Sequence, residues 1–146
     1  MEKKEEKKLD ENIYNKIINL ASKQNFLNLL GIQLDYMEKG KVIMSAENKK
    51  EFSQAIDYMH GGMVATLLDT AGAYAALTLV GETEYIVTSE LKINYIRPVI
   101  SKKVFATGNV INKGKTIIVV EADLKDENDK LLAKMMGSMF VVSAKN

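Results

Sequence analysis

The stretch from His60 to Gly81 constrains the fold more than any other part of the sequence. Its length and its many alanines and leucines predict an α-helix rather than a strand. Between Gly62 and Val80 it carries a single charged residue, Asp69. A helix that is apolar almost all round is normally buried. The rest of the chain must therefore supply a cover for it.

The segments on both sides of this helix have the patterns of β-strands. Two strand-like runs between Ile32 and Glu47 flank the turn sequence Glu38-Lys39-Gly40-Lys41, which predicts a hairpin. After the helix, apolar residues alternate with polar ones up to Tyr95 and predict a strand with one buried face, which Pro98 ends. The apolar set is Tyr85, Val87, Leu91, Ile93 and Tyr95, and the polar set is Thr88, Glu90, Lys92 and Asn94. Three more strand-like stretches follow at Val104 to Ile111, Thr116 to Leu124 and Leu131 to Val142.

The order of these elements predicts the fold class. Apolar residues at helical spacing indicate a first, amphipathic helix from Leu9 to Leu30, ended by Gly31. The order is then helix, two strands, long helix, four strands. Short turns between the strands favour antiparallel pairing, and the apolar helix must pack against that sheet. We therefore expect an α+β domain in which a sheet wraps a helix.

Length and charge narrow the possible functions. The 146 residues suffice for one hydrophobic core, so a single globular domain is expected. The net charge of +1 gives no basic excess for nucleic acid. The charged start MEKKEEKKLDEN lacks the apolar stretch of a signal peptide, and no run reaches the roughly 18 apolar residues of a membrane span. We therefore expect a cytoplasmic protein that binds neither nucleic acid nor membranes.

The residue types that the chain lacks exclude several chemistries. There is no cysteine, which removes disulfides, thiolate nucleophiles and cysteine-based metal sites. The single histidine, His60, excludes a zinc site with two or three histidines within one chain. No G-x-S-x-G sequence accompanies it, as a serine hydrolase of the α/β type would require. We expect no metal site.

Asp69 has two interpretations. It can be a helix-interior aspartate satisfied by a hydroxyl or a backbone amide, or it can be functional, since a charge in an apolar setting is costly unless paired or used. The positions that share its helix face are all small, which would leave room for a substrate or a neighbouring subunit. They are Gly62, Ala65, Thr66, Gly72, Ala73 and Ala76. The opposite face has the bulk of a core, with Met63, Leu67, Ala71, Tyr74 and Leu77.

His60-Gly61-Gly62 stands where the long helix begins, with Asp57 as an N-cap or turn residue ahead of it. Backbone N–H groups at a helix start are unpaired and partly positive, so they suit a developing oxyanion, and glycines let a ligand approach the backbone. The alternative interpretation of His60 is a packed or capping residue.

Taken together, His60-Gly61-Gly62, Asp69 nine residues after the histidine, the small residues from Ala71 to Ala76, and Asn94-Tyr95-Ile96-Arg97-Pro98 resemble the PaaI-like hotdog thioesterases. The resemblance covers roughly residues 31–142. It implies a hotdog fold, in which a six-stranded antiparallel sheet wraps a long helix. It also implies a homodimer or homotetramer with active sites at the subunit interface. Residues 1–30 would be a charged N-terminal helical extension and residues 31–146 the hotdog thioesterase domain.

The resemblance also implies roles for individual residues. Asp69 would be the nucleophile or general base, and the amide of Gly61 or Gly62 would polarise the thioester carbonyl, with His60 shaping that oxyanion hole. Gln54, six residues before the histidine, takes the position of a polar residue that orients water or the carbonyl. Family members with an aspartate on the helix often carry asparagine there. Thr88 matches a hydroxyl position near the site, although the alternation also fits an ordinary strand residue.

Further positions would contact the substrate. Coenzyme A carries phosphates, so the resemblance predicts cations near the pocket mouth. The candidates are Arg97 and Pro98 at the Arg-Pro corner, and Lys113, Gly114 and Lys115 in the turn Asn112-Lys113-Gly114-Lys115. For each lysine, a solvated hairpin residue is the alternative. Apolar residues such as Met59, Met63 and Tyr74 would contact the acyl group.

The predicted function is hydrolysis of a small aryl- or medium-chain acyl-CoA without a cofactor. One alternative is a non-catalytic acyl-CoA-binding module, which would keep the cleft but need no ionised carboxylate. Another is a hotdog dehydratase or hydratase, against which the lack of a second histidine argues.

Overall fold

The computed structural model describes residues 7–144. The first six residues of the charged start lie outside the described residues. Two helices, α2 (Glu11–Lys23) and α3 (Asn25–Leu30), precede a hairpin of β1 (Gln33–Glu38) and β2 (Lys41–Glu47). A 3-10 turn, η1 (Lys50–Phe52), leads to the long helix α4 (Gly61–Leu77). Four strands follow: β3 (Glu84–Tyr95), β4 (Lys103–Lys113), β5 (Ile117–Asp126) and β6 (Leu131–Ser143).

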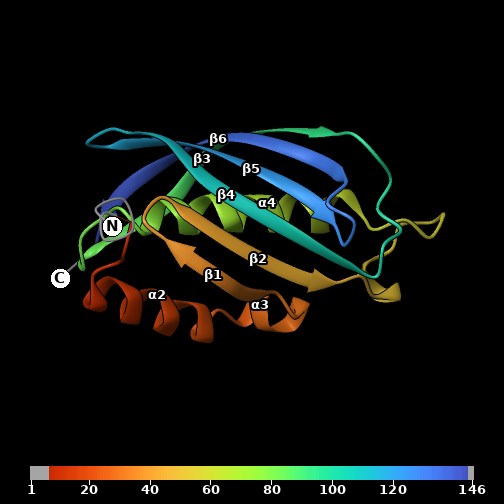
Figure 1. Cartoon of the computed structure of the whole chain (residues 1–146), viewed down its shortest axis with the longest axis horizontal. Coiled ribbons are helices and arrows are strands. Elements are labelled where there is room, and N and C mark those ends of the chain that lie inside the picture. The colour runs from red at the N-terminus through yellow and green to blue at the C-terminus, as the bar shows by residue number, and fades with distance from the viewer. Residues whose placement is uncertain (1–6, 145–146) are drawn as a thin grey trace.

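The strands form one six-stranded sheet in the order β1-β2-β4-β5-β6-β3, and every neighbouring pair is antiparallel. Helix α4 lies across one face of this sheet, while α2 and α3 lie beside β1 (Figure 1). The predicted α+β architecture, a six-stranded antiparallel sheet around a long helix with an added N-terminal helix, is confirmed. Within residues 7–144, no helix has both the length and the apolar character needed to cross a bilayer.

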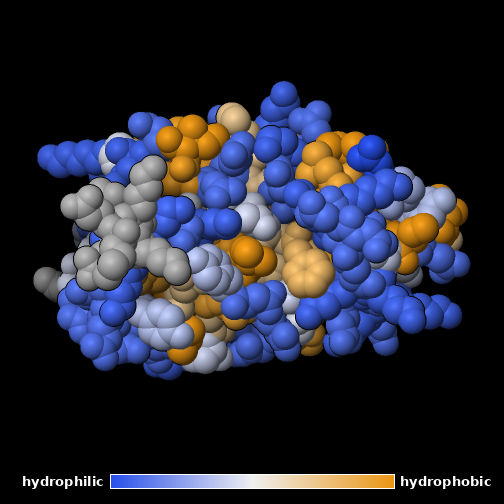
Figure 2. All heavy atoms as spheres, in the orientation of Figure 1, coloured by the Kyte–Doolittle hydropathy of each residue, from blue (hydrophilic) through white to orange (hydrophobic). Residues whose placement is uncertain are grey.

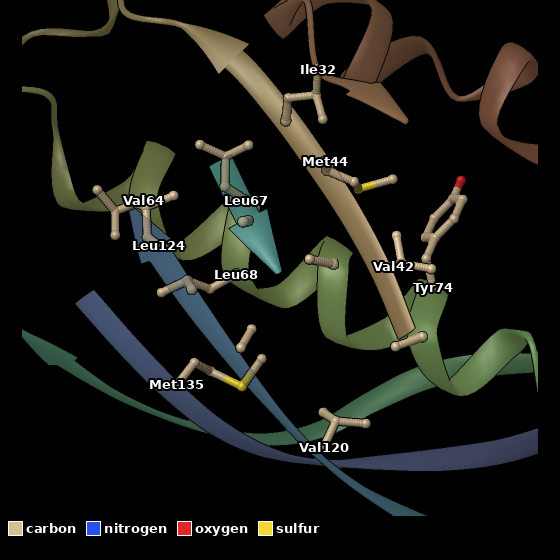
Figure 3. Packing of buried hydrophobic residues seen from close by; sticks show 14 of the residues in the cluster. Ile32, Val42, Met44, Val64, Leu67, Leu68, Tyr74, Val120, Leu124 and Met135 are labelled. Atoms are coloured by element: carbon tan, nitrogen blue, oxygen red, sulfur yellow. The ribbon is translucent and has the colours of Figure 1, made fainter. Parts of the chain in front are cut away.

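The hydrophobic core lies between α4 and the sheet. The predicted core face of the helix is confirmed, since Leu67 and Ala71 are fully buried and Met63, Tyr74 and Leu77 nearly so. They pack with side chains from the inner face of the sheet (Figure 3). Ile17 of α2 and Leu27 of α3 are buried in the same cluster. The surface on the side seen in Figure 2 is mostly hydrophilic, with hydrophobic patches between the charged side chains.

The N-terminal helix is interrupted, whereas the sequence predicted one continuous helix from Leu9 to Leu30. Gln24 has an extended backbone (φ −78°, ψ 98°) and separates α2 from α3. Its side chain donates a hydrogen bond to the hydroxyl of Tyr74 at 2.9 Å, and Asn28 donates to the carbonyl of Ser22 at 3.0 Å. A tertiary hydrogen bond from the Gln24 side chain and a local one to the carbonyl of Ser22 thus stabilise the break and override the helical pattern.

Strand β3 contains an irregularity that the alternation did not predict. The register with β6 shifts between Thr88 and Glu90, as in a β-bulge. Beyond the shift, Leu91 and Ile93 pack against the core as expected, but before it Ile86 does so and Val87 is 49% exposed. A bulge reverses the side-chain phase, so the prediction that placed Val87 on the buried face was wrong. Thr88 consequently shares the inner side of β3 with Ile86.

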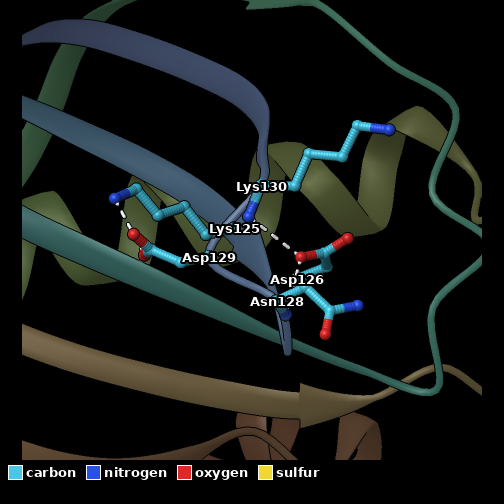
Figure 4. Close-up of polar contacts among 5 residues, drawn as sticks. All are labelled: Lys125, Asp126, Asn128, Asp129 and Lys130. Carbon is cyan, nitrogen blue, oxygen red and sulfur yellow. Dashed lines mark hydrogen bonds and ion pairs between the residues drawn. The ribbon is translucent and has the colours of Figure 1, made fainter.

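The turn between β5 and β6 has the chemistry that its sequence predicted. The Asp126 carboxylate accepts hydrogen bonds from the N–H groups of Asn128 and Lys130, both at 2.9 Å. Asp129 has a positive φ of 61°, and its carboxylate pairs with Lys125 at 3.0 Å (Figure 4). The charged side chains of Lys125, Asp126 and Asp129 therefore stabilise the turn of a surface hairpin.

The backbones of α4 and the sheet come close together at Gly108 of β4. A Cβ built on Gly108 would lie 2.2 Å from the carbonyl oxygen of Ala71 and 2.8 Å from the N–H nitrogen of Gly72. Both are backbone atoms, so no rotamer change relieves the overlap. The helix backbone can approach the strand this closely only because residue 108 lacks a side chain.

We therefore predict that Gly108→Ala lowers the free energy of unfolding by at least about 2 kcal/mol, because α4 must move away from the sheet. Urea denaturation followed by circular dichroism, at equal protein concentrations, measures this. Gly81→Ala is the control, since a Cβ there would meet only the flexible end of Glu84 at 3.3 Å. Equal stability of the two variants would contradict the prediction.

Candidate active site

Asp69 and Thr88 form a pair at the edge of the sheet. Asp69 lies half-buried in the middle of α4, and Thr88 lies on β3, an edge strand. The Thr88 hydroxyl donates a hydrogen bond to Oδ1 of Asp69 at 2.6 Å. A hydroxyl thus satisfies the carboxylate, as the first interpretation of Asp69 predicted, and the side chain remains partly accessible; its functional role stays a prediction. Only the bulge in β3 allows Thr88 to reach the carboxylate.

A cavity of about 230 Å³ opens beside Asp69. Its walls come from three elements: α2 with Gln24 at its end, α4, and the first residues of β3. The lining residues are Leu20, Gln24, Asp69, Thr70, Ala73, Tyr74, Leu77, Tyr85 and Ile86. The carboxylate thus borders a mostly apolar space, as a group that acts on an acyl thioester would require.

The small residues around Asp69 divide between two surroundings. Ala73 lines the cavity, as expected for a face left open to a ligand. Gly72 and Ala76 are instead buried, and a Cβ on Gly72 would lie 2.8 Å from the methyl carbon of Met135 and 3.0 Å from Val120. For these two positions the predicted open stripe was wrong, because they allow α4 to approach the sheet.

The start of α4 is capped by His60. Its Nδ1 accepts a hydrogen bond from the N–H of Gly62 at 2.8 Å, so the capping interpretation of His60 is confirmed. Asp57 is not the N-cap; it occupies the preceding turn with a positive φ of 64°. For the N–H of Gly61 no acceptor is found within residues 7–144. Of the two candidate oxyanion amides, Gly61 is therefore the one left free.

Gly61 borders a second cavity, which Gln54, Arg97 and Pro98 also line. The carboxamide oxygen of Gln54 accepts a hydrogen bond from the N–H of Ile56 at 2.6 Å, which holds its side chain in the turn before α4. Gln54 and Gly61 thus come together, as the sequence predicted, but at a different cavity from the one that Asp69 lines.

Tyr95 is a site residue to which the sequence assigned no role. Its hydroxyl donates a hydrogen bond to the carbonyl of Gly61 at 3.2 Å, and its ring would lie 3.3 Å from a Cβ on Gly61. Tyr95 therefore holds the start of α4 in place, and its ring leaves little room for a side chain at residue 61. Its place in Asn94-Tyr95-Ile96-Arg97-Pro98 was the available signal.

The two halves of the site are separated along α4. Gly61 and Asp69 are eight residues apart, which is about 12 Å along a helix axis. An amide that polarises a carbonyl and a carboxylate that attacks it, directly or through one water, must lie within a few ångströms of the same carbon. One chain alone therefore does not assemble them.

The predicted cations lie at opposite ends of the sheet. Arg97 donates to the carbonyl of Leu131 at 2.7 Å, near the start of β6. Lys113 pairs with Ile118 at the far end of β5, and both Lys113 and Lys115 are exposed. The N–H of Gly114 bonds the carbonyl of Ile117 at 2.9 Å and closes that turn. On β5, the partner of Leu131 is Lys125 and the partner of Lys113 is Ile118, seven residues earlier, which is about 23 Å along a strand. One chain therefore does not bring Arg97 and the lysines together.

No metal centre is found in the described part of the chain, where no three His, Cys, Asp or Glu side chains gather as a metal would require.

Comparison with known proteins identifies the family. The family model described as the thioesterase superfamily matches residues 57–133, which include the start of α4 and Asp69. A protein of Saccharolobus solfataricus named as an esterase is 37% identical over 116 residues, covering 80% of this chain and 82% of its own. Human acyl-coenzyme A thioesterase 13 is 30% identical over 118 residues, covering 79% and 84%.

The structural comparison agrees. The Escherichia coli PaaI protein from the phenylacetic acid degradation operon superposes with a TM-score of 0.86 at 22% identity. The superposition covers 94% of this chain and 98% of that protein. At that identity the likeness concerns the fold. The family match, the sequence relatives and the shared fold together show that the chain belongs to the thioesterase superfamily. It is a hydrolytic enzyme with the PaaI-like hotdog fold.

Proposed function

We propose that the protein hydrolyses the thioester bond of a small aryl- or medium-chain acyl-CoA. The observation that carries the proposal is the Asp69–Thr88 pair, a hydrogen-bonded carboxylate that borders a mostly apolar cavity. The relatives named as esterase and acyl-coenzyme A thioesterase support the same reaction.

The chemistry assigns one role to each half of the site. Asp69 acts as nucleophile or as general base toward water, with Thr88 fixing the orientation of its carboxylate. The free N–H of Gly61 stabilises the negative charge that develops on the thioester oxygen. Gln54, beside Gly61, orients the carbonyl or the water. The C–S bond breaks, a C–O bond forms, and the free acid and the thiol of coenzyme A are released.

The two halves of the site are separated by about 12 Å along the axis of α4. This separation leads us to propose a homo-oligomeric enzyme. Strand β3 carries Thr88 and leaves one edge unpaired within residues 7–144, so it offers a second copy a strand to pair with. In a two-fold dimer, each site would then combine Asp69 and Thr88 of one chain with Gly61 and Gln54 of the partner subunit. Arg97, Lys113 and Lys115, remote within one chain, would hold coenzyme A phosphates across the same interface.

Asp69→Asn should lower turnover by at least about 100-fold while the protein stays folded, because the variant keeps the shape and removes the charge. Thiol release from a panel of acyl-CoAs, with circular dichroism as the folding check, measures it. Asp35→Asn, an exposed carboxylate on β1, is the control. A wild-type protein that binds acyl-CoAs but releases no thiol from any of them would instead be a binding module.

The Gly61 amide can be tested without losing the helix start. Proline is tolerated at the first position of a helix, and His60 already has the extended backbone (φ −60°, ψ 137°) that a residue before proline adopts. We expect Gly61→Pro to lower kcat by about 100-fold or more, because it removes the N–H. Gly61→Ala is the control: its Cβ meets the same Tyr95 ring, but it keeps the N–H. It should therefore retain most activity.

Mixing two inactive variants tests whether sites are shared between chains. If Asp69→Asn and Gly61→Pro are unfolded and refolded together, half of the dimers are mixed, and each mixed dimer has one intact site. We therefore expect about a quarter of wild-type activity to return. No recovery, together with a monomeric mass in solution, would overturn the shared site.

A further inference from the structure

A small polar cavity lies where β1 begins, β2 ends and β4 begins. Its lining residues are Gly31, Gln33, Ser45, Ala46, Glu47, Lys49 and Lys103, and we call it the Ser45 cavity. Its volume is about 210 Å³, which is below the roughly 300–1,000 Å³ of pockets for drug-sized ligands. None of its residues lines the cavities beside Asp69 or Gly61, so it is separate from the proposed active site.

The pairing register places four of these side chains on the outer face of the sheet. On β2, Met44 is packed in the core, so Ser45, which follows it, points to the face away from α4. Glu47, two residues farther on, shares that face. Residues opposite each other in an antiparallel pair also share a face, which adds Gln33, opposite Ser45. Lys103, opposite Glu47, is the fourth.

Ser45 carries a buried hydroxyl without a hydrogen-bond partner. The residue is fully buried, and within residues 7–144 its Oγ neither donates nor accepts a hydrogen bond. A buried polar group that lacks a partner is unfavourable, because it has given up its hydrogen bonds to water. Since Ser45 also lines the cavity, its side chain lies at the bottom, where a ligand oxygen would supply the partner.

Two ammonium groups border the same cavity without a carboxylate partner. Among the described residues, neither Lys49 nor Lys103 lies within ion-pairing distance of an acidic side chain. Lys49 reaches toward Gly31, since its Nζ lies 3.5 Å from the position of a Cβ there. The Nζ of Lys103 lies 5.3 Å from the centre of the Phe105 ring, and Phe105 is the β4 neighbour of Ser45. Two positive charges thus accompany the unpartnered hydroxyl.

We propose that the Ser45 cavity binds a phosphate group. Lysine binds phosphate as a point charge, and a tetrahedral oxyanion offers oxygens to donors that come from several directions. Lys49 and Lys103 supply the charge, while the hydroxyl of Ser45 and the carboxamide of Gln33 donate to the phosphate oxygens. A planar carboxylate is matched best by the fork of an arginine, and no arginine lines this cavity.

The Glu47 carboxylate shares the cavity and repels the anion, so it limits the affinity. Two lysines and one glutamate nevertheless leave the lining with a net charge of +1. The small volume fits inorganic phosphate or the phosphate end of a small metabolite. Binding there does not depend on thioester hydrolysis, so the proposal is independent of the proposed function.

Isothermal titration calorimetry of the full chain with sodium phosphate, at an ionic strength held constant with sodium chloride, tests the proposal. We expect saturable binding and a higher thermal midpoint in phosphate than in chloride. Glycerol 3-phosphate is titrated in the same way, and the tighter of the two shows whether the site prefers the free ion or a phosphorylated small molecule. If neither binds saturably, or if acetate binds as tightly, the proposal is overturned.

Three variants should each weaken phosphate binding by about fivefold or more, because each removes a donor: Ser45→Ala, Lys49→Met and Lys103→Met. Lys41→Met is the matched control, since Lys41 lies on the same strand and face as Ser45 but about 13 Å along it and outside the cavity. It should bind phosphate as the wild-type protein does. Equal weakening by Lys41→Met and Lys103→Met would mean that surface charge alone attracts the anion, and the site would be refuted.

Two measurements separate recognition from a structural role. Ser45→Ala removes an unpartnered hydroxyl, so without phosphate it should be at least as stable as the wild-type protein in urea denaturation. A clear loss of stability would show that the hydroxyl serves the fold, against the proposal. Glu47→Gln keeps the shape and removes the negative charge, so it should tighten phosphate binding about threefold or more. Unchanged or weaker binding by Glu47→Gln would contradict the assignment of an anion.

Discussion

The contact between the backbones of α4 and β4 at Gly108 sets the distance between the middle of the long helix and the sheet. The Ala71 carbonyl occupies the space that a side chain at residue 108 would need, so the helix lies closer to the sheet than it could beside any other residue. Asp69 precedes this contact by two residues, so its height above the sheet is fixed by it. Strand β3 at the sheet edge can then bring Thr88 within 2.6 Å of the carboxylate. A side chain at residue 108 would move the helix and separate this pair.

A rigid helix that positions both halves of the site also keeps them apart. The proposed oxyanion amide lies at the helix start, where N–H groups are free, and the proposed catalytic carboxylate lies two turns further on. No bending of α4 could bring them to one carbon without breaking its hydrogen bonds. The same rigidity gives each half a fixed direction, which is what a two-fold partner needs in order to complete two equal sites. Oligomerisation is thus proposed here as a requirement of the chemistry.

The sequence predicted the features that depend on pattern and missed those that depend on tertiary contacts. The period of α4, the turn residues and the strand runs identify the architecture, and the one charge on an apolar helix makes Asp69 a candidate site residue. The bulge in β3 could not be predicted, because Ser89 carries no signal that separates it from an ordinary strand residue. The break at Gln24 was missed for a related reason: the helical pattern continues through it, and one of the hydrogen bonds at the break goes to Tyr74, fifty residues away.

A local hydrogen bond decides which amide of His60-Gly61-Gly62 is available, although the sequence left both open. The imidazole of His60 satisfies the N–H of Gly62, as a capping side chain does. Tyr95 holds the carbonyl of Gly61 from the other side, so the peptide between them cannot rotate freely. The N–H of Gly61 belongs to the preceding peptide, whose carbonyl, that of His60, accepts hydrogen bonds from the N–H groups of Met63 at 2.9 Å and Val64 at 3.3 Å. This peptide is therefore held as well, and within residues 7–144 no acceptor is found for the N–H of Gly61. In the proposed mechanism the histidine would only position the backbone, so a residue able to cap α4 equally well could replace it.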